Sequence, residues 1–529
     1  MVARTRGEAN VAGMVGRALR MMTGTLVSRV LGLAREVMVA ALFGATRALD
    51  AFYISYTLAN LARQLLAEGA LSASFVPAFS RAYGRGGADS ARELARGVLS
   101  ILLVACSVVV LLGVLASPLL IRIIAPGFEG EHSRLAVSLS RAMFPFLIFV
   151  SVGALAMGVL NSVGSFFVPS VAPAVSNLAF IAILAVASRG GGTIWALPVA
   201  VLAGGACSMS LQCFWAWRMG IGLTPSLPDM RNSDLRECLA LFLPYAAGLS
   251  LNQINPVISR VLGSFLEGGV ISALNYADRI IQLPLGLFVV AISQAVLPML
   301  SRIAPDDSEE FRTFIRDALR FNLFIVLPAA IGLIVAARPI VHILLMRGAF
   351  DEWAWNTTSG ALACYAAGLP GTACNTVLMR ALYARTMPRA AMKVMALTVC
   401  ANLFLGAILM RRFSYIGLAI GTSCAFTCAA FAAAWHLSRG IGRNIGMFGA
   451  AWLVRLVLSC SVMTGVILAE ARILPYPIEG SFVLRSAWVL ATVLLGGASY
   501  AAVTVLLRCP EWGWIRAALA RRRDEGIIG

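Results

Sequence analysis

The sequence has 529 residues, of which 59% are apolar and 13% are charged, and its formal net charge is +18 at pH 7. Soluble domains average about 45–50% apolar and about 25% charged residues, so this composition excludes a soluble enzyme, a disordered regulator and a disulfide-stabilised secreted protein. A chain of this length instead has room for a dozen or more membrane-spanning helices of about 20 apolar residues each. We therefore predict an all-α polytopic membrane protein.

Apolar runs separated by short polar connections predict about 14 transmembrane helices. We place them near residues 13–41, 48–82, 94–124, 134–160, 167–188, 193–218, 235–264, 270–302, 311–337, 355–384, 389–410, 414–438, 449–470 and 484–508. Several of these helices are longer than a bilayer requires, so we expect tilts, kinks or extensions beyond the membrane. The first stretch carries Arg29 and Arg35 and has no convincing cleavage site, which favours a retained helix over a signal peptide.

The distribution of arginine predicts the orientation of these helices. Arginines are concentrated between Arg81 and Arg96 and again at Arg521–Arg523, which the positive-inside rule assigns to the cytoplasm. Arg411 and Arg412 are exceptions, because they fall on the outer side. We predict a protein of the cytoplasmic (inner) membrane with both termini in the cytoplasm.

The sequence also repeats itself. Val27–Gly32 (VSRVLG) returns as Ile258–Gly263 (ISRVLG), and Pro118–Phe128 resembles Pro339–Phe350. The offset of about 220–230 residues corresponds to six helices, an even number, so the two copies share one orientation as a parallel repeat. This predicts a transporter with two pseudo-symmetric six-helix lobes and two additional helices. The predicted boundaries are 1–220, 221–440 and 441–529.

Charged side chains inside apolar helices are the strongest functional signal, because burying them in a membrane is costly. Within this group, Ser28, Gly32 and Arg35 share one helix face, whereas Arg29 and Glu36 share another. The full set comprises Arg29, Arg35, Glu36, Asp50, Arg63, Glu68, Asp278 and Arg279. A basic cavity between lobes would select an anionic substrate, and guanidinium groups suit phosphate. The alternative is that these arginines reach the headgroups or pair with neighbouring carboxylates.

Other chemistries have no support in the sequence. It contains no phosphate-binding loop, no Gly-x-Ser-x-Gly elbow and no Cys-x-x-Cys pair, and its three histidines are scattered. We therefore predict a protein that is not an enzyme and that needs no cofactor or metal. Because the basic residues lie in short connections between apolar runs, we expect membrane lipids rather than nucleic acid as their partners.

Several motifs resemble those of the MurJ (MviN) lipid II flippase family, in order and along nearly the whole chain. They are Ser28–Glu36, Phe43-Gly44, Asp50–Phe52, Ala67–Ala70, Phe75–Pro77, Ala125–Phe128, Asn275–Arg279 and Arg347–Phe350. The resemblance implies the fold of the multidrug/oligosaccharidyl-lipid/polysaccharide exporter superfamily. The implied substrate is lipid II, the undecaprenyl-pyrophosphate-linked disaccharide-pentapeptide. It also implies that the last two helices form a groove for the lipid tail.

The resemblance assigns roles to particular residues. Arg29, Arg35, Arg63 and Arg279 match the arginines of the family's cavity, and Asp50 matches as well. We add Ser28, Glu68, Asp278 and Arg260 as candidate substrate-binding residues, the last being an additional basic residue in the second repeat. The chain departs from the family at two places. Ala59 stands where many relatives have proline, and the seventh helix offers Asn252 and Asn255 but no carboxylate for sodium.

Three functions follow from these observations. The first is a flippase that moves lipid II by alternating access, in contact with membrane lipids and the cell-wall synthesis machinery. The second is a cation-coupled multidrug exporter or a polysaccharide-lipid exporter on the same fold, for which a multidrug cavity should be lined by carboxylates rather than arginines. The third is a membrane scaffold, in which cavity substitutions would leave function intact.

Overall fold

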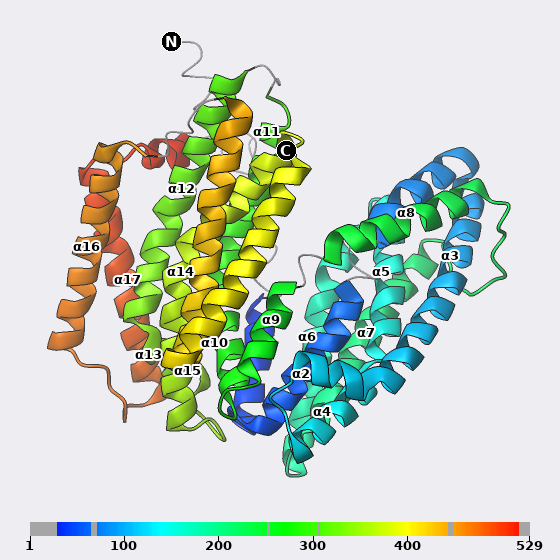
Figure 1. The fold of residues 1–529 in the computed structure, drawn as a ribbon, viewed down its shortest axis with the longest axis horizontal. Helices are drawn as coiled ribbons and strands as arrows, with labels where there is room; N and C mark the ends of the chain where they lie inside the picture. The colour runs from blue at the N-terminus through cyan, green and yellow to red at the C-terminus, as the bar shows by residue number, and fades with distance from the viewer. Residues whose placement is uncertain (1–28, 65–70, 251–253, 304–306, 443–447, 518–529) are drawn as a thin grey trace. The chain divides into compact units, whose positions relative to one another are not determined.

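The computed structural model describes residues 29–64, 71–250, 254–303, 307–442 and 448–517. Within these ranges the regular secondary structure is helical, without strands, as the composition predicts. A first helix covers residues 29–43. It is followed by α2 (Arg47–Arg63), α3 (Ser72–Ile124), α4 (Gly130–Met143), α5 (Phe146–Ser162), α6 (Phe167–Arg189), α7 (Ala196–Arg218), α8 (Ser233–Ser250) and α9 (Ile254–Gly263) (Figure 1).

The remaining helices follow without a long connection in the described residues. They are α10 (Val270–Pro284), the π-helix η3 (Leu285–Val290), α11 (Ala291–Leu300), α12 (Ser308–Val335), α13 (Ala337–Leu345), α14 (Glu352–Ala384), α15 (Pro388–Ile441), α16 (Ala450–Ile473) and α17 (Phe482–Leu506). The last two match the predicted helices near 449–470 and 484–508. A short turn of helix over residues 511–517 then packs its Trp514 near Phe321 of α12.

Two very long helices each contain a break where the sequence predicts one. In α3 the backbone leaves helical geometry at Gly86 and Gly87, between the predicted helices that end at 82 and begin at 94. In α15 the break falls at Ser414, whose φ of 51° and ψ of −131° are unusual for a residue with a side chain. The hydropathy pattern therefore located both breaks in helical geometry to within a few residues.

Elsewhere single predicted helices are divided. The helix predicted at 134–160 is interrupted at Pro145, since proline has no N–H to continue the ladder of backbone hydrogen bonds. The helix predicted at 270–302 changes to π-helix directly after Pro284 and then returns to α-helix. Such π segments insert an extra residue into a helix and are frequent at functional sites. The structure thus places an irregularity close to the predicted Arg279.

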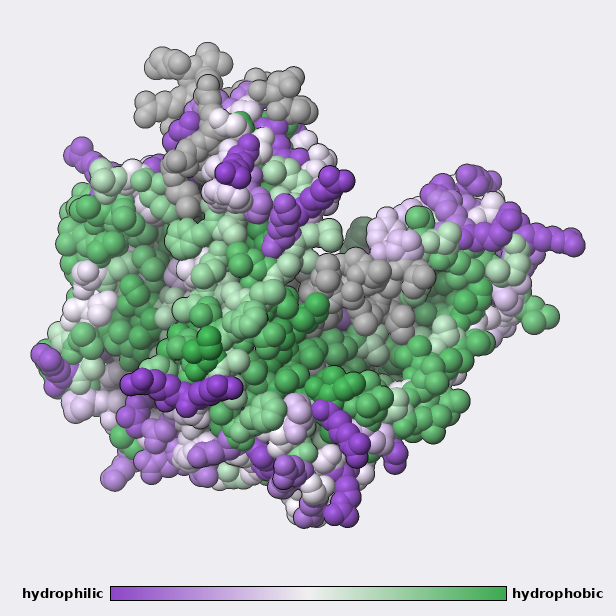
Figure 2. Space-filling model, in the orientation of Figure 1, coloured by the Kyte–Doolittle hydropathy of each residue, from purple (hydrophilic) through white to green (hydrophobic). Residues whose placement is uncertain are grey.

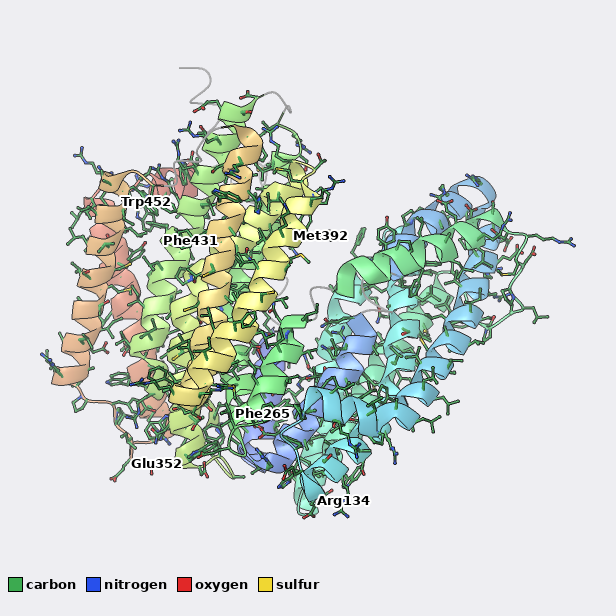
Figure 3. All side chains as sticks on the ribbon, viewed as in Figure 1. Arg134, Phe265, Glu352, Met392, Phe431 and Trp452 are labelled. Carbon is green, nitrogen blue, oxygen red and sulfur yellow. The ribbon has the colours of Figure 1, made fainter. Side chains whose placement is uncertain are left out.

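The helices are long and apolar enough to cross a membrane. Among the described residues, nine helical segments meet this criterion, so the chain is a multi-pass membrane protein. Met392 and Phe431 on α15, labelled in Figure 3, are exposed by 56% and 64%. On the face shown in Figure 2, apolar side chains cover the sides of α12 and α15, whereas hydrophilic residues gather at the helix ends. Such a surface is stable only against lipid.

The chain divides into two compact units, each with its own apolar core. Among the described residues, one unit comprises residues 29–272 and 348–350, and the other comprises residues 273–347 and 351–517, with the gaps given above. Phe75, Phe79 and Leu147 lie in the core of the first, and Phe311, Ile315 and Leu378 in that of the second. The unit boundary after Ser272 differs from the predicted lobe boundary at residue 220, because α8 packs on α3 of the first unit.

Candidate functional site

Arg35 lies at the centre of a polar network within the first unit. Its NH2 group donates to Glu36 Oε1 over 2.7 Å, and its NH1 group donates to Asn177 Oδ1 of α6 over 3.4 Å. The guanidinium also lies 5.0 Å from the ring centroid of Phe180, one helical turn further along α6. Gly32 also faces this group, since a Cβ added there would lie 3.8 Å from the Asn177 amide nitrogen, an ordinary contact distance. The four residues of this network thus come from two different helices.

Tyr53 of α2 extends the network to a second arginine. Its hydroxyl donates to Glu36 Oε2 over 2.8 Å, and the guanidinium carbon of Arg260 lies 5.9 Å from its ring centroid. Arg260 NH1 also donates to the carbonyl of Ile271 over 3.4 Å. The structure therefore brings two of the predicted basic residues, Arg35 and Arg260, to the same tyrosine–glutamate pair. Arg35 pairs with Glu36 and Arg260 lies against the Tyr53 ring, so this part of the unit holds two guanidinium groups beside one carboxylate.

Two further predicted arginines lie on the same helices. Arg29 is half-buried at the beginning of the described part of the first helix, about 9 Å along the helix axis from Arg35 at 1.5 Å per residue. Arg63 is half-buried in the last turn of α2, where its Nε donates to Asn60 Oδ1 over 2.8 Å. Both belong to the first unit, like the Arg35 network.

Asp50 has a different environment from the one expected of a substrate ligand. Its side chain is fully buried, and its Oδ2 accepts a hydrogen bond from the N–H of Gly269 over 2.6 Å. Its Oδ1 accepts from the N–H and the hydroxyl of Ser272 over 2.7 and 2.6 Å. These donors lie at the beginning of α10, where backbone N–H groups have no partner within the helix. Asp50 therefore caps a helix 219 residues away in sequence.

The other unit contains a second polar group on α10. Asp278 Oδ2 accepts from Gln282 Nε2 over 2.5 Å, and Arg279 NH1 donates to Gln282 Oε1 over 3.2 Å. Gln282 thus joins the predicted acid and the predicted arginine, three residues before the π-helix begins. Ser28 and Glu68, also predicted site residues, lie outside the described residues.

Sequence reasoning did not single out Tyr53, Phe180 or Asn177 as site residues. A polar residue in the middle of an apolar helix such as α6 is a usable signal for Asn177. Nothing in the local sequence of α2 distinguishes Tyr53 from Tyr56, which lies one turn further along the same helix. Only the packing of α2 against the first helix identifies it.

Chemically, these groups can bind an anion. Within the described residues, the two hydrogen bonds of Arg35 use two of the five N–H donors that a guanidinium carries. Its side chain keeps 19% of its surface exposed, whereas that of Glu36 keeps 3%. Glu36 therefore holds Arg35 in place, and the exposed part of Arg35 faces outward from the pair. A guanidinium held in this way suits a phosphate group.

Comparison with known proteins agrees with these features. The model of the family "Lipid II flippase MurJ" matches residues 39–487. The chain belongs to the MurJ family. It is 34% identical over 510 residues to a probable lipid II flippase MurJ of Rhizobium tropici, covering 94% of this chain and 95% of that protein. It is 31% identical to the corresponding protein of Vibrio cholerae serotype O1, covering 91% of this chain and 94% of that protein.

Solved structures give the same result. A lipid II flippase MurJ in an inward closed conformation matches with a TM-score of 0.77 and 26% identity, over 92% of this chain and 98% of the other. An inward-facing MATE-family multidrug transporter of the MOP superfamily matches with a TM-score of 0.68 at 17% identity, over 81% of this chain and 98% of that one. The second match shows a shared fold. Together they confirm the predicted fold class and the predicted MurJ family.

Proposed function

We propose that this MurJ family member translocates lipid II from the inner to the outer leaflet of the cytoplasmic membrane by alternating access. The observation that carries the proposal is the Arg35–Glu36–Tyr53–Arg260 network, which concentrates positive charge among apolar helices of a membrane protein. Intramembrane charge of this kind marks a substrate pathway. Family membership identifies the substrate for which such a site is suited.

In this proposal the pyrophosphate of lipid II is the group that the arginines bind. Arg29, Arg35, Arg63 and Arg279 are its ligands, and Arg260 adds charge beside Tyr53. Forked contacts from several guanidinium groups to one pyrophosphate are strong and geometrically specific. Ser28, Glu68 and Asp278 complete the proposed set as hydrogen-bonding neighbours of the headgroup, and the prenyl tail stays in the lipid beside α16 and α17.

Asp50 contributes to the proposed site by fixing the position of α10. Its carboxylate already accepts three hydrogen bonds from Gly269 and Ser272. We therefore assign it the role of fixing the beginning of α10, the helix that carries Asp278 and Arg279, rather than direct contact with pyrophosphate.

The test uses the purified protein in proteoliposomes loaded with fluorescent lipid II, with exposure of the headgroup measured over time. A hydrogen bond to a charged group contributes about 1.5–3 kcal/mol, so Arg35→Ala should lower headgroup affinity by about 10–100-fold. Arg35→Lys keeps the charge but loses the fork, and should rescue the activity only in part. Arg122→Ala is the matched control, because Arg122 is exposed on α3. Equal translocation by the Arg35→Ala and Arg122→Ala variants would overturn the proposal.

The same liposomes test the two alternatives. A cation-coupled exporter on this fold would move a cationic dye such as ethidium under an ion gradient and would leave lipid II in place. A scaffold would move neither, and Arg35→Ala would be harmless in cells. The MATE-family neighbours support the fold of an exporter, yet the described network is rich in arginine and not in carboxylates.

We also propose the orientation that the arginine distribution predicts, with both termini in the cytoplasm and residues 129–132 outside. Single cysteines introduced near Asp307 should then react with a membrane-impermeant reagent only after the membrane is opened. Labelling near Asp307 in intact cells would reverse the orientation.

A further inference from the structure

Two loops of the first unit contact helix ends through a glycine without room for a side chain. At Gly127, in the loop after α3, an added Cβ would lie 2.4 Å from the carbonyl oxygen of Ser264, directly after α9. At Gly348, in the loop after α13, it would lie 2.1 Å from the carbonyl oxygen of Ala41, near the end of the first helix. Real Cβ atoms do not approach this closely, so both positions require glycine or a displaced loop.

In each contact a backbone N–H of the loop donates a hydrogen bond to the helix end. The N–H of Gly127 donates to Ser264 Oγ over 3.1 Å, and the N–H of Ala349 donates to the carbonyl of Ala41 over 2.8 Å. Ser264 is fully buried, and its own N–H donates to the carbonyl of Arg260 over 3.0 Å. The loop therefore holds the turn of helix that bears Arg260.

The two loops correspond in the internal repeat, but the places that they contact do not. Gly127 and Gly348 occupy corresponding places in the repeated segments Pro118–Phe128 and Pro339–Phe350. Because Val27–Gly32 aligns with Ile258–Gly263, Ser264 corresponds to Leu33 and Ala41 to Ser272. Each loop nevertheless contacts the backbone near the end of a helix.

The helices that are held in this way carry the candidate arginines. Ala41 lies six residues beyond Arg35, about 9 Å along the first helix at 1.5 Å per residue, and Ser264 lies four residues beyond Arg260, about 6 Å. Arg47 joins the Gly127–Ser264 contact to α2, since its NH1 donates to the carbonyl of Leu266 over 2.7 Å and its guanidinium carbon lies 5.1 Å from the Phe128 ring centroid. Phe265, beside Ser264, is labelled in Figure 3.

We propose that Gly127 and Gly348 are positioning residues, which fix the axial position of the helices bearing Arg260 and Arg35 by docking a loop on the end of each. This inference rests on the proposed function, because it assigns the two arginines to substrate binding. A helix is stiff along its axis, so a displacement at Ala41 is transmitted to Arg35, about two turns away. In the same way, a displacement at Ser264 is transmitted to Arg260, about one turn away. A loop that cannot dock leaves the arginine displaced from the pyrophosphate.

The decisive comparison is Gly348→Ala against Gly130→Ala. Both glycines have a positive φ, +61° and +54°, so both variants carry the same kind of backbone strain. Nothing lies within 4 Å of a Cβ added at Gly130, whereas one at Gly348 meets Ala41. We would measure thermal unfolding in detergent, the dissociation constant for undecaprenyl pyrophosphate, and lipid II translocation in proteoliposomes.

We expect Gly348→Ala to raise the dissociation constant and to slow translocation by about tenfold or more, since displacements of about 1 Å are costly in a site that depends on orientation. Gly130→Ala should bind and translocate like the native protein. A purely structural role would lower the folded fraction of both variants without changing the dissociation constant of the folded protein. Equal dissociation constants for the two variants would overturn the inference.

Ser264→Ala decides the case in which Gly348→Ala does not fold, because it removes the acceptor for Gly127 without adding volume. Its control is Ser138→Ala, which removes a hydroxyl that donates only within α4 among the described contacts. A raised dissociation constant for Ser264→Ala alone supports positioning, and an unchanged one overturns it. Arg35→Ala and Arg260→Ala are measured in parallel. If both are harmless, the proposed function fails. If both weaken binding and the glycine and serine variants do not, only the positioning role fails.

Discussion

The two polar groups of the molecule place an arginine beside an acid in different ways. Arg35 and Glu36 are neighbours in sequence, but their other partners come from α2 and α6, with Asn177 lying 142 residues from Arg35. Asp278, Arg279 and Gln282 stand within two turns of α10, and their described hydrogen bonds run along that one helix. The described hydrogen bonds of the first group therefore join three helices, whereas those of the second group lie along α10.

This difference predicts how each group responds to change. Removing a member of the first group leaves a buried partner on another helix, so stability and binding should fall together. Removing Gln282 from the second group breaks two described hydrogen bonds within α10, and we expect a smaller loss of stability. The π-helix that follows Pro284 lies next to the second group and offers that helix a place to bend.

The largest effect should come from Arg35→Ala. It leaves the carboxylate of Glu36, 3% exposed, without its cation, and breaking a buried ion pair costs about 3–5 kcal/mol. We expect loss of both stability and translocation. The double variant Arg35→Ala/Glu36→Gln removes the unpaired charge and should regain stability but not translocation. Measurement of unfolding in detergent and of lipid II translocation separates the two effects. Recovery of translocation in the double variant would contradict a direct role for Arg35.

The next largest effect should come from substitutions of Asp50, whose hydrogen-bond partners, like Asn177 of the Arg35 network, are distant in the sequence. Asp50→Ala leaves two backbone N–H groups and one hydroxyl buried without an acceptor, at a cost of about 1–3 kcal/mol each. Asp50→Asn retains one carbonyl oxygen and should destabilise the protein less. The free energy of unfolding in detergent measures both variants. Equal losses would show that capping of α10 is not what Asp50 contributes.

A smaller effect is expected in the second group. Gln282→Leu removes the amide that joins Asp278 and Arg279, and a net hydrogen bond is worth about 0.5–1.5 kcal/mol. Translocation should slow by about 2–10-fold, with little change in stability. Gln212→Leu on α7 is the control for the loss of a buried amide outside the group. A loss of stability as large as that of Arg35→Ala would remove the distinction between the two groups.

The smallest effect on translocation should come from replacing sodium with potassium. The carboxylates of Glu36, Asp50 and Asp278 already accept hydrogen bonds from a guanidinium, from amide N–H groups or from a side-chain amide. A hard cation prefers several oxygen ligands, including carboxylates, and would have to displace these donors. Translocation should be unchanged when potassium replaces sodium at equal ionic strength and equal membrane potential. A saturable stimulation of translocation by sodium would show that one of these carboxylates is available to bind the cation. Asn252, which the sequence offered as a sodium ligand, lies outside the described residues.

The sequence by itself determined the fold class and the places of the breaks in α3 and α15, whereas several predicted helices are divided in the structure. The helical class follows from local chemistry, since an apolar run in a bilayer must satisfy its backbone hydrogen bonds internally. The break at Gly86 and Gly87 lies between two predicted helices, whereas Pro145 interrupts one that was predicted to be continuous. The sequence also identified the charged residues inside the helices, because their insertion is costly in any packing arrangement. The repeat was visible in the same way.

Only the tertiary structure decided what those charged residues contact. The sequence predicts Asp50 as a substrate-binding acid of the cavity. In the structure its hydrogen-bond partners are Gly269 and Ser272, which lie 219 and 222 residues further along the chain. Tyr53 carries no local signal, yet its hydroxyl joins Glu36 and its ring lies beside Arg260. A hydrogen bond depends on distances of a few ångströms between groups on different helices. Such distances are set by the packing of whole helices, which no segment of the sequence specifies alone.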